Sequence, residues 1–261
     1  MSRSTALASD PEVGSGALTV APDDFDSQAL GIRICRIVSL SAREPEEYHS
    51  LLSGLKARLR AQAWQQVLRR TELGHFAEIW ALERAGFELM DVGVTFARTL
   101  PGEGQPPVAD ELVIRPSTDR DIEQIAEAMV RAPWGSRYES DPAYDPARVA
   151  DLRRRWLWNS HRGRADVVFV GVLDGEPAGY VTCRLDRETG DGEIELVGTL
   201  PRFRGRRVAN RVLAHAVGWF SDRARLVSVR TQATNIAAAK LYQTSGFTLA
   251  SSDATFRLML D

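Results

Sequence analysis

The chain is poor in cysteine, in net charge and in long apolar runs. Its two cysteines, Cys35 and Cys183, cannot form a disulfide framework, so we expect a reducing, cytoplasmic location. No apolar run approaches the ~18 residues of a membrane-spanning helix. The first residues, MSRSTALASDPEVGSG, lack the apolar core of a signal peptide. The sequence therefore predicts no membrane partner.

The near-absence of net charge excludes a protein whose whole surface attracts nucleic acid. The 33 Lys and Arg residues are balanced by 35 Asp and Glu, which gives a formal charge of -2. The four histidines show no ligand spacing, so we expect no metal. A hydrophobic content of 44% with six Trp and nine Phe is typical of a folded core. Any basic function must come from a local cluster.

Composition divides the 261 residues into four parts. Residues 1–24 are rich in Ser, Ala, Gly, Pro and Asp and are predicted to be a mobile leader. Residues 101–111, PGEGQPPVADE, hold three prolines and two glycines and are predicted to be a linker. We therefore expect a smaller α/β domain over residues 25–100 and a second domain over residues 112–261.

Hydrophobic periodicity predicts alternating strands and helices in both domains. Within residues 112–261 the predicted order is β-α-α-β-β-β-α-β-α-β, and Asp174-Gly175 is a strong hairpin signal. The first domain is predicted to hold strands at 31–40, 63–69 and 87–100, and helices at 44–60 and 75–85.

An internal similarity links the two halves. Residues 80–96, WALERAGFELMDVGVTF, match residues 240–256, KLYQTSGFTLASSDATF, at a constant offset of 160. We interpret the match as a duplicated helix–turn–strand unit. Leu82 stands where the second copy has Tyr242, so we expect the first copy to have kept the scaffold and lost the site.

The most informative segment is 196–213, LVGTLPRFRGRRVANRVL, which predicts a strand, a tight turn and an amphipathic helix. Such a turn directs backbone N–H groups outward at a helix N-terminus and forms an anion site. The pattern lacks both the Walker Gly-Lys-Ser/Thr and GxGxxG. A solvated basic helix start or a nucleic-acid patch stays open as an alternative. Five arginines fall within ten residues, at Arg202, Arg204, Arg206, Arg207 and Arg211.

The segment 202–209 resembles the acetyl-CoA motif of the GNAT N-acetyltransferase superfamily, with Arg207 where glycine is usual. Residues 226–247 are also similar to that family, with Asn-x-x-Ala-x-x-Leu-Tyr followed by Gly-Phe. The resemblance implies an α/β (α+β) GNAT fold, in which a mixed central sheet is flanked by helices, preceded here by a degenerate GNAT-like domain. It also implies acetyl-CoA as co-substrate.

Residue roles follow from this resemblance and from the chemistry of a thioester, which an amine attacks without an enzyme nucleophile. Tyr242 is the expected general acid, and Glu195 is a candidate base that could equally be structural. If the strand before the loop splays from the next, the thioester sits in the gap. The expected cofactor-binding residues are Val197, Thr199, Leu200, Arg204, Gly205, Arg206, Arg207, Val208, Ala209, Asn210, Asn235 and Ala238.

The layout further resembles the two-domain dTDP-fucosamine acetyltransferase family, which acetylates the 4-amino group of a nucleotide-linked deoxyamino sugar. The similar features are Ala85-Gly86-Phe87, Ser136-Arg137-Tyr138 and the run from Thr231 to Ala238. We expect the aromatic loop 131–147, through Trp134, Arg137 and Tyr138, to bind the acceptor. The alternative is a surface loop whose aromatic side chains pack inward.

Other functions remain open at this stage. The chain could acetylate a protein or peptide amine or another small amine, or it could be a non-catalytic acyl-CoA-binding module. The expected partners are acetyl-CoA and a small amine, with no nucleic acid, and the expected state is a monomer or homodimer.

Overall fold

The computed structural model describes residues 17–100, 111–130 and 136–260. The described chain forms two compact units. Unit 1 comprises residues 17–93, 141–148 and 252–260, and unit 2 comprises residues 94–100, 111–130, 136–140 and 149–251. None of the described helices is long and apolar enough to cross a membrane.

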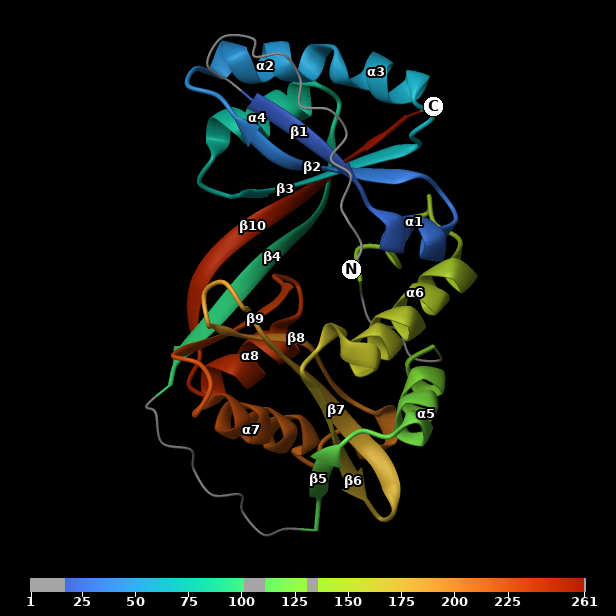
Figure 1. Cartoon of the computed structure of the whole chain (residues 1–261), viewed down its shortest axis with the longest axis vertical. Helices are drawn as coiled ribbons and strands as arrows, with labels where there is room; N and C mark the ends of the chain where they lie inside the picture. The colour runs from blue at the N-terminus through green and yellow to red at the C-terminus, as the bar shows by residue number, and fades with distance from the viewer. Residues whose placement is uncertain (1–16, 101–110, 131–135, 261) are drawn as a thin grey trace. The chain divides into compact units, whose positions relative to one another are not determined.

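Unit 1 is a sheet covered by helices on one side, where α2, α3 and α4 gather over β1 to β3 (Figure 1). Its strand order is β1-β2-β3-β10-β4, with β2 and β3 parallel. Its elements are β1 (Ala17–Pro22), α1 (Asp24–Leu30), β2 (Ile34–Ser41), α2 (Pro45–Ser53), α3 (Leu55–Ala61), β3 (Gln66–Glu72), α4 (Phe76–Arg84), the start of β4 (Glu88–Thr99) and most of β10 (Thr248–Met259).

Residues 17–24 correct the expected leader. They form β1 and the start of α1, and β1 pairs antiparallel with β2. The physical reason is a short alternation, because Leu18 and Val20 point into the core and are 3% and 5% exposed. The alternation has a period of two residues and is short, and the many small residues around it made the segment resemble a mobile leader. Residues 1–16 of the expected leader lie outside the described chain.

The helix expected over 44–60 is two helices. Gly54 separates α2 from α3, since glycine has a lower helix propensity than every residue except proline. The predicted apolar face is nevertheless confirmed. Its four leucines lie in the core, at Leu51, Leu52, Leu55 and Leu59.

Unit 2 is a sheet with helices on both faces, in the strand order β10-β4-β9-β8-β7-β6-β5. The element order predicted for residues 112–261 is confirmed throughout. The elements are β5 (Val113–Pro116), α5 (Asp119–Val130), α6 (Pro146–Asn159), a π-helical turn (Ser160–Arg164), β6 (Val167–Leu173), β7 (Glu176–Leu185), β8 (Gly192–Thr199), a 3₁₀ turn (Pro201–Phe203), α7 (Val208–Phe220), β9 (Leu226–Gln232) and α8 (Ile236–Thr244).

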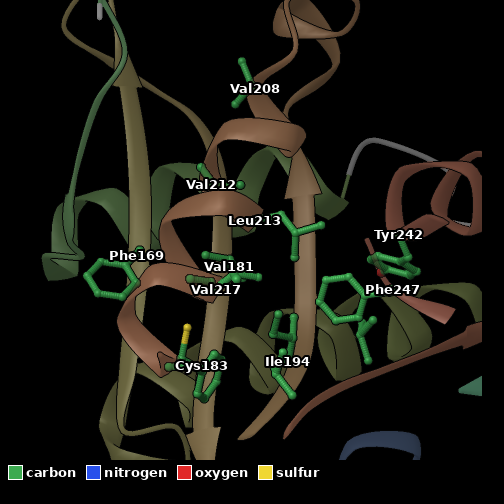
Figure 2. Close-up of a cluster of buried hydrophobic side chains, with 14 of the residues drawn as sticks. Phe169, Val181, Cys183, Ile194, Val208, Val212, Leu213, Val217, Tyr242 and Phe247 are labelled. Atoms are coloured by element: carbon green, nitrogen blue, oxygen red, sulfur yellow. The ribbon is translucent and has the colours of Figure 1, made fainter. Parts of the chain in front are cut away.

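Alternating side chains on the strands build two separate cores on the two faces of unit 2. Phe169 packs against α7, whereas its neighbours Val168 and Val170 belong to the core formed with α5 and α6. Figure 2 shows the first core, in which Val212 and Leu213 of α7 point toward the strands. The predicted hairpin is present, with positive φ at both Asp174 and Gly175.

The two halves of the sequence exchange their last strands. Residues 94–99 of β4 belong to unit 2, where β4 lies beside β9, and residues 252–259 of β10 belong to unit 1, where β10 pairs with β3. The compact units therefore differ from the expected division, which assigned 25–100 and 112–261 to separate domains. Residues 101–110 of the expected linker lie outside the described chain.

The expected helix–turn–strand repeat is present as structure. All six element bounds of β3, α4 and β4 recur 160 residues later as β9, α8 and β10. The turn glycines also match, since Gly86 and Gly246 have φ values of 87° and 82°. Both positions need the left-handed conformation that glycine adopts without strain.

Candidate active site

A gap opens in the sheet of unit 2 between the parallel strands β8 and β9. Their pairing covers three residues on each strand, ending at Ile194 and Val229, although both strands continue. A bulge in β8 coincides with this point: the pairing with β7 shifts, and the Leu196 N–H donates to Thr182 Oγ1 at 2.9 Å. Bulges bend a strand and disrupt its ladder. The divergence of these two strands, which was only a condition in the expectation from sequence, is therefore observed.

Two of the predicted β8 contacts lie on this diverging stretch, namely Val197 and Thr199. Beyond Ile194, the described residues of β8 pair with β7 and not with β9, so their groups on the β9 side can meet a ligand. Leu200 differs, because its N–H donates to Ala178 O at 2.9 Å. Its backbone N–H is therefore already used.

The loop after β8 leads directly into α7. Phe203 is buried and anchors the loop, while Gly205 and Arg207 both have positive φ, at 81° and 57°. No side chain of the described residues caps α7, which leaves the N–H groups of its first turn, at Val208, Ala209 and Asn210, for an anion.

A glycine on β7 lets the start of α7 lie close to the sheet. A Cβ at Gly179 would fall 2.6 Å from Val208 Cγ1 and 2.8 Å from the Gly198 carbonyl oxygen. Any larger residue would displace the helix start. The position of the anion site relative to the gap thus depends on Gly179.

The five arginines do not act as one cluster. Arg202 is ion-paired with Glu176 and lies over the Phe203 ring, and Arg206 lies 3.4 Å from Asp174. Arg204 and Arg207 have no ion-pair partner within the described chain. These two guanidinium groups are the ones available to an anionic ligand.

Tyr242 lies in the core of unit 2 that is formed with α7. Its ring centroid is 5.7 Å from that of Phe96 and 6.1 Å from that of Phe247, and the residue is 3% exposed (Figure 2). Burial raises the pKa of its hydroxyl, which stays protonated at neutral pH. Tyr242 can therefore donate a proton.

Asn235 and Ala238 meet each other at the start of α8. The Asn235 side-chain oxygen accepts a hydrogen bond from the Ala238 N–H at 3.1 Å and caps the helix. This structural role is sufficient to explain an Asn at the position, so a contact with the cofactor stays a prediction.

Glu195 is held by arginines. Its carboxylate accepts hydrogen bonds from Arg164 at 2.7 and 3.2 Å, and Arg184 Nε lies 3.6 Å away. The side chain is 15% exposed. The ion pairs hold the Glu195 carboxylate in a fixed orientation at the bulge.

The expected acceptor loop is divided between the units, and its described aromatic rings face inward. Tyr138 is 1% exposed, lies 6.2 Å from the Trp156 ring, and accepts a hydrogen bond from Arg137 at 2.9 Å. Tyr144 belongs to unit 1 and hydrogen-bonds Gln66. Trp134 lies outside the described residues. A substrate role for Arg137 and Tyr138 stays a prediction.

Neither cysteine is a nucleophile. Both are fully buried, and burial raises the pKa of Cys35 to about 12 and that of Cys183 as well. Across residues 17–100, 111–130 and 136–260, no group of three His, Cys, Asp or Glu side chains could hold a metal ion.

The first copy closes the equivalent gap with its own side chains. Arg69 donates to the carbonyl oxygens of Ile37 and Val38 on β2 at 3.3 and 3.4 Å, and its Nε donates to Glu78 at 2.7 Å. Glu78 is 2% exposed and occupies the position of Ala238 in the repeat. In unit 1, a buried ion pair thus occupies the position that corresponds to the gap between β8 and β9 in unit 2.

Sequence reasoning missed two residues that the structure brings to the gap, Tyr180 of β7 and Gly198 of β8. They are directly opposite each other in the β7–β8 pairing. An aromatic residue within an apolar strand is normally interpreted as a core residue. Only the strand register shows that Tyr180 lies opposite a glycine.

Residues 126–247 match the acetyltransferase (GNAT) family. The spore coat polysaccharide biosynthesis protein SpsD of Bacillus subtilis is 31% identical over 134 residues, which are 51% of this chain and 46% of that protein. The chain thus spans less than half the length of this relative.

Solved structures share the fold. A GCN5-related N-acetyltransferase from Sphaerobacter thermophilus aligns with a TM-score of 0.66 and 17% identity, over 94% of this chain and 77% of the other. A tandem GNAT protein from the clavulanic acid biosynthesis pathway aligns with a TM-score of 0.67 and 14% identity, over 94% and 79%. These structures show the same fold as this chain, and residues 126–247 are similar to the acetyltransferase (GNAT) family.

Proposed function

We propose that the chain transfers an acetyl group from acetyl-CoA directly to a primary amine of a small molecule. One observation carries the proposal: the stretch of β8 that has left β9 leads through a single turn to the uncapped start of α7. An extended pantetheine arm needs exposed strand groups, and a pyrophosphate needs the backbone N–H groups of a helix N-terminus. Unit 2 offers both in the order in which acetyl-CoA would require them.

The proposed cofactor contacts follow the chain. Val197 and Thr199 bind the pantetheine arm through backbone groups, and the turn from Arg204 to Arg207 with the first turn of α7 binds the pyrophosphate. The guanidinium groups of Arg204 and Arg207 add charge to those N–H groups. We propose that Asn235 lies near the cofactor. Its side-chain oxygen already caps α8, so the proposal includes no direct hydrogen bond from that oxygen to the cofactor.

The reaction needs no covalent enzyme intermediate. The amine nitrogen forms a bond to the thioester carbon, the C–S bond breaks, and the thiolate takes the proton of Tyr242. The proton lost by the nitrogen passes through water to Glu195 and solvent, and solvent reprotonates Tyr242. Its raised pKa keeps Tyr242 in the acid form before each turnover.

We propose a nucleotide-linked amino sugar as the acceptor. The similarity to SpsD, a protein named for spore coat polysaccharide biosynthesis, supports a sugar-related substrate. The proposed phosphate contact is the Arg137 guanidinium, which lies 4.5 Å over the buried Tyr138 ring. The first acceptor to test is therefore dTDP-4-amino-4,6-dideoxygalactose.

Free-thiol release from acetyl-CoA tests the proposal across a panel of amines that includes this sugar nucleotide, other amino sugars and lysine peptides. We expect release with the sugar nucleotide. Tyr242→Phe is expected to lower kcat by about 100-fold while changing the acetyl-CoA Kd less than threefold. Binding of acetyl-CoA without thiol release for any amine would instead indicate a binding module.

A further inference from the structure

Tyr180 lies across the backbone of β8 at the gap. It pairs directly with Gly198, and a Cβ at Gly198 would fall 2.7 Å from the tyrosine ring and 2.8 Å from its hydroxyl oxygen. The ring therefore occupies the space that any other residue at Gly198 would need. The position of the Tyr180 side chain therefore requires glycine at residue 198.

The direction of the side chain follows from the strand order. β8 has β7 on one side and β9 on the other, so a side chain that starts on β7 and crosses Gly198 reaches toward β9. Gly198 lies on the stretch of β8 that has left β9. The Tyr180 hydroxyl thus points to the gap.

A second tyrosine belongs to the core on the other face of the sheet. Tyr180 packs in the core formed with α5 and α6, whereas Tyr242 packs in the core formed with α7. Burial raises the pKa of the Tyr180 hydroxyl, and the Tyr242 phenol interacts with it electrostatically. The two phenols thus belong to cores on opposite faces of the sheet.

The Tyr180 hydroxyl has no hydrogen-bond partner in the described chain, although the residue is 1% exposed. Buried hydroxyls are normally paired, because an unmet donor costs free energy. Packing alone would be served equally well by phenylalanine. The hydroxyl is therefore suited to a ligand that enters the gap.

The side from which this ligand enters is also defined. Gly179, the residue before Tyr180, faces the start of α7, where the cofactor phosphates are proposed to bind. Neighbouring residues on a strand face opposite sides. Tyr180 therefore faces the side away from the phosphates, where α5 and α6 lie, and we infer that the acceptor approaches the thioester from this side.

We propose that Tyr180 is a second catalytic tyrosine, whose hydroxyl oxygen accepts a hydrogen bond from an N–H of the acceptor amine and so directs the nitrogen lone pair at the thioester carbon. This inference rests on the proposed function. Tyr180 gains and loses no proton: it orients the nucleophile, while Tyr242 protonates the leaving thiolate.

Tyr180→Phe removes the hydroxyl and keeps the ring. With the sugar nucleotide, or whichever panel amine the wild type acetylates, we expect kcat/KM for the amine to fall about tenfold. The KM for acetyl-CoA and the melting temperature are expected to stay near wild type. Tyr48→Phe, on α2 of unit 1, is the matched control and should change none of these values.

Gly198→Ala is a second, independent variant, because its Cβ would push the ring aside. It is expected to lower the amine kcat/KM in the same way, and it should have little further effect when combined with Tyr180→Phe. Amine kinetics of Tyr180→Phe equal to wild type, or a defect confined to acetyl-CoA, would overturn the role of Tyr180 alone. A wild type that acetylates no amine would overturn the proposed function and this role with it.

Discussion

Phe96 packs against Tyr242, with ring centroids 5.7 Å apart, although the two residues come from different halves of the chain. Phe96 lies on β4, which ends the first copy of the repeat, and Tyr242 lies on α8 of the second. The first half thus supplies part of the surface that holds the proposed acid. Unit 2 is incomplete without it.

Phe96→Ala should therefore destabilise the unit that carries the site. Phe96 is 3% exposed, and removing a buried phenyl ring costs about 3–5 kcal/mol. We expect urea unfolding to show this loss, with a lower kcat from a less constrained Tyr242. Phe76→Ala, at a residue 59% exposed, is the control and should cost below about 1 kcal/mol. Equal losses would show that Phe96 is not part of this core.

Two substitutions of Arg207 can separate the effect of its backbone conformation on stability from the effect of its charge on acetyl-CoA binding. Its φ of 57° is costly for any residue except glycine, so Arg207→Gly should raise the free energy of unfolding by about 1 kcal/mol and Arg207→Ala should not. Both variants lose the guanidinium, and both should weaken acetyl-CoA binding by a similar factor of about ten. Calorimetry of the two variants measures each effect. Unchanged affinity in both would remove Arg207 from the phosphate site.

Glu195 and Glu193 offer a matched pair on β8. Both contact Arg184, yet only Glu195 lies at the bulge where β8 leaves β9. If Glu195 receives the amine proton, Glu195→Gln should lower kcat about 10- to 100-fold at neutral pH, with less effect at alkaline pH. Glu193→Gln should stay within about twofold. Similar kinetics for the two variants would identify Glu195 as structural.

Asp121 should make the free energy of unfolding of unit 2 depend on pH in the acid range. Burial alone would raise the pKa of Asp121, but hydrogen bonds from Arg115 and Thr118 outweigh burial and lower it to about 2. A pKa below the unfolded value near 3.8 stabilises the fold above pH 3.8, and this contribution is lost as the pH falls toward 2.

Asp121→Asn should accordingly cost about 2 kcal/mol between pH 5 and 8, and the difference from wild type should shrink below pH 4. Chemical denaturation at several pH values measures it. Asp151→Asn, which breaks an exposed pair with Arg155, should cost less than about 0.5 kcal/mol. A difference that persists at pH 2 would argue against the titration.

Local features were predictable because short-range physics sets them. Asp174-Gly175 adopts the two positive φ angles of a tight hairpin, and the valines of α7 form the predicted apolar face. The loop after β8 was predictable because its charge, glycine and helix start are contiguous. These features need no knowledge of distant partners.

Features that depend on distant pairing were not predictable. The apolar pattern of β4 and of β10 would be the same whether or not the two strands were exchanged. The pattern therefore cannot predict which unit each strand joins. Tyr180 and Gly198 are informative only as a pair, and their register follows from a bulge at Glu195 and Leu196. The role of Arg69 in the first copy depends on Glu78, which is nine residues away in sequence and pairs with it only in the folded chain.

The exchanged strands bear on how such a chain can evolve. A deletion that removed the first half, with its filled gap, would also remove the strand that lies beside β9 and the ring that packs on Tyr242. A loss of the second half would equally take β10 from beside β3. The copy without an open site is thus protected from loss by the copy that has one, and the gene cannot be shortened to one repeat in a single step.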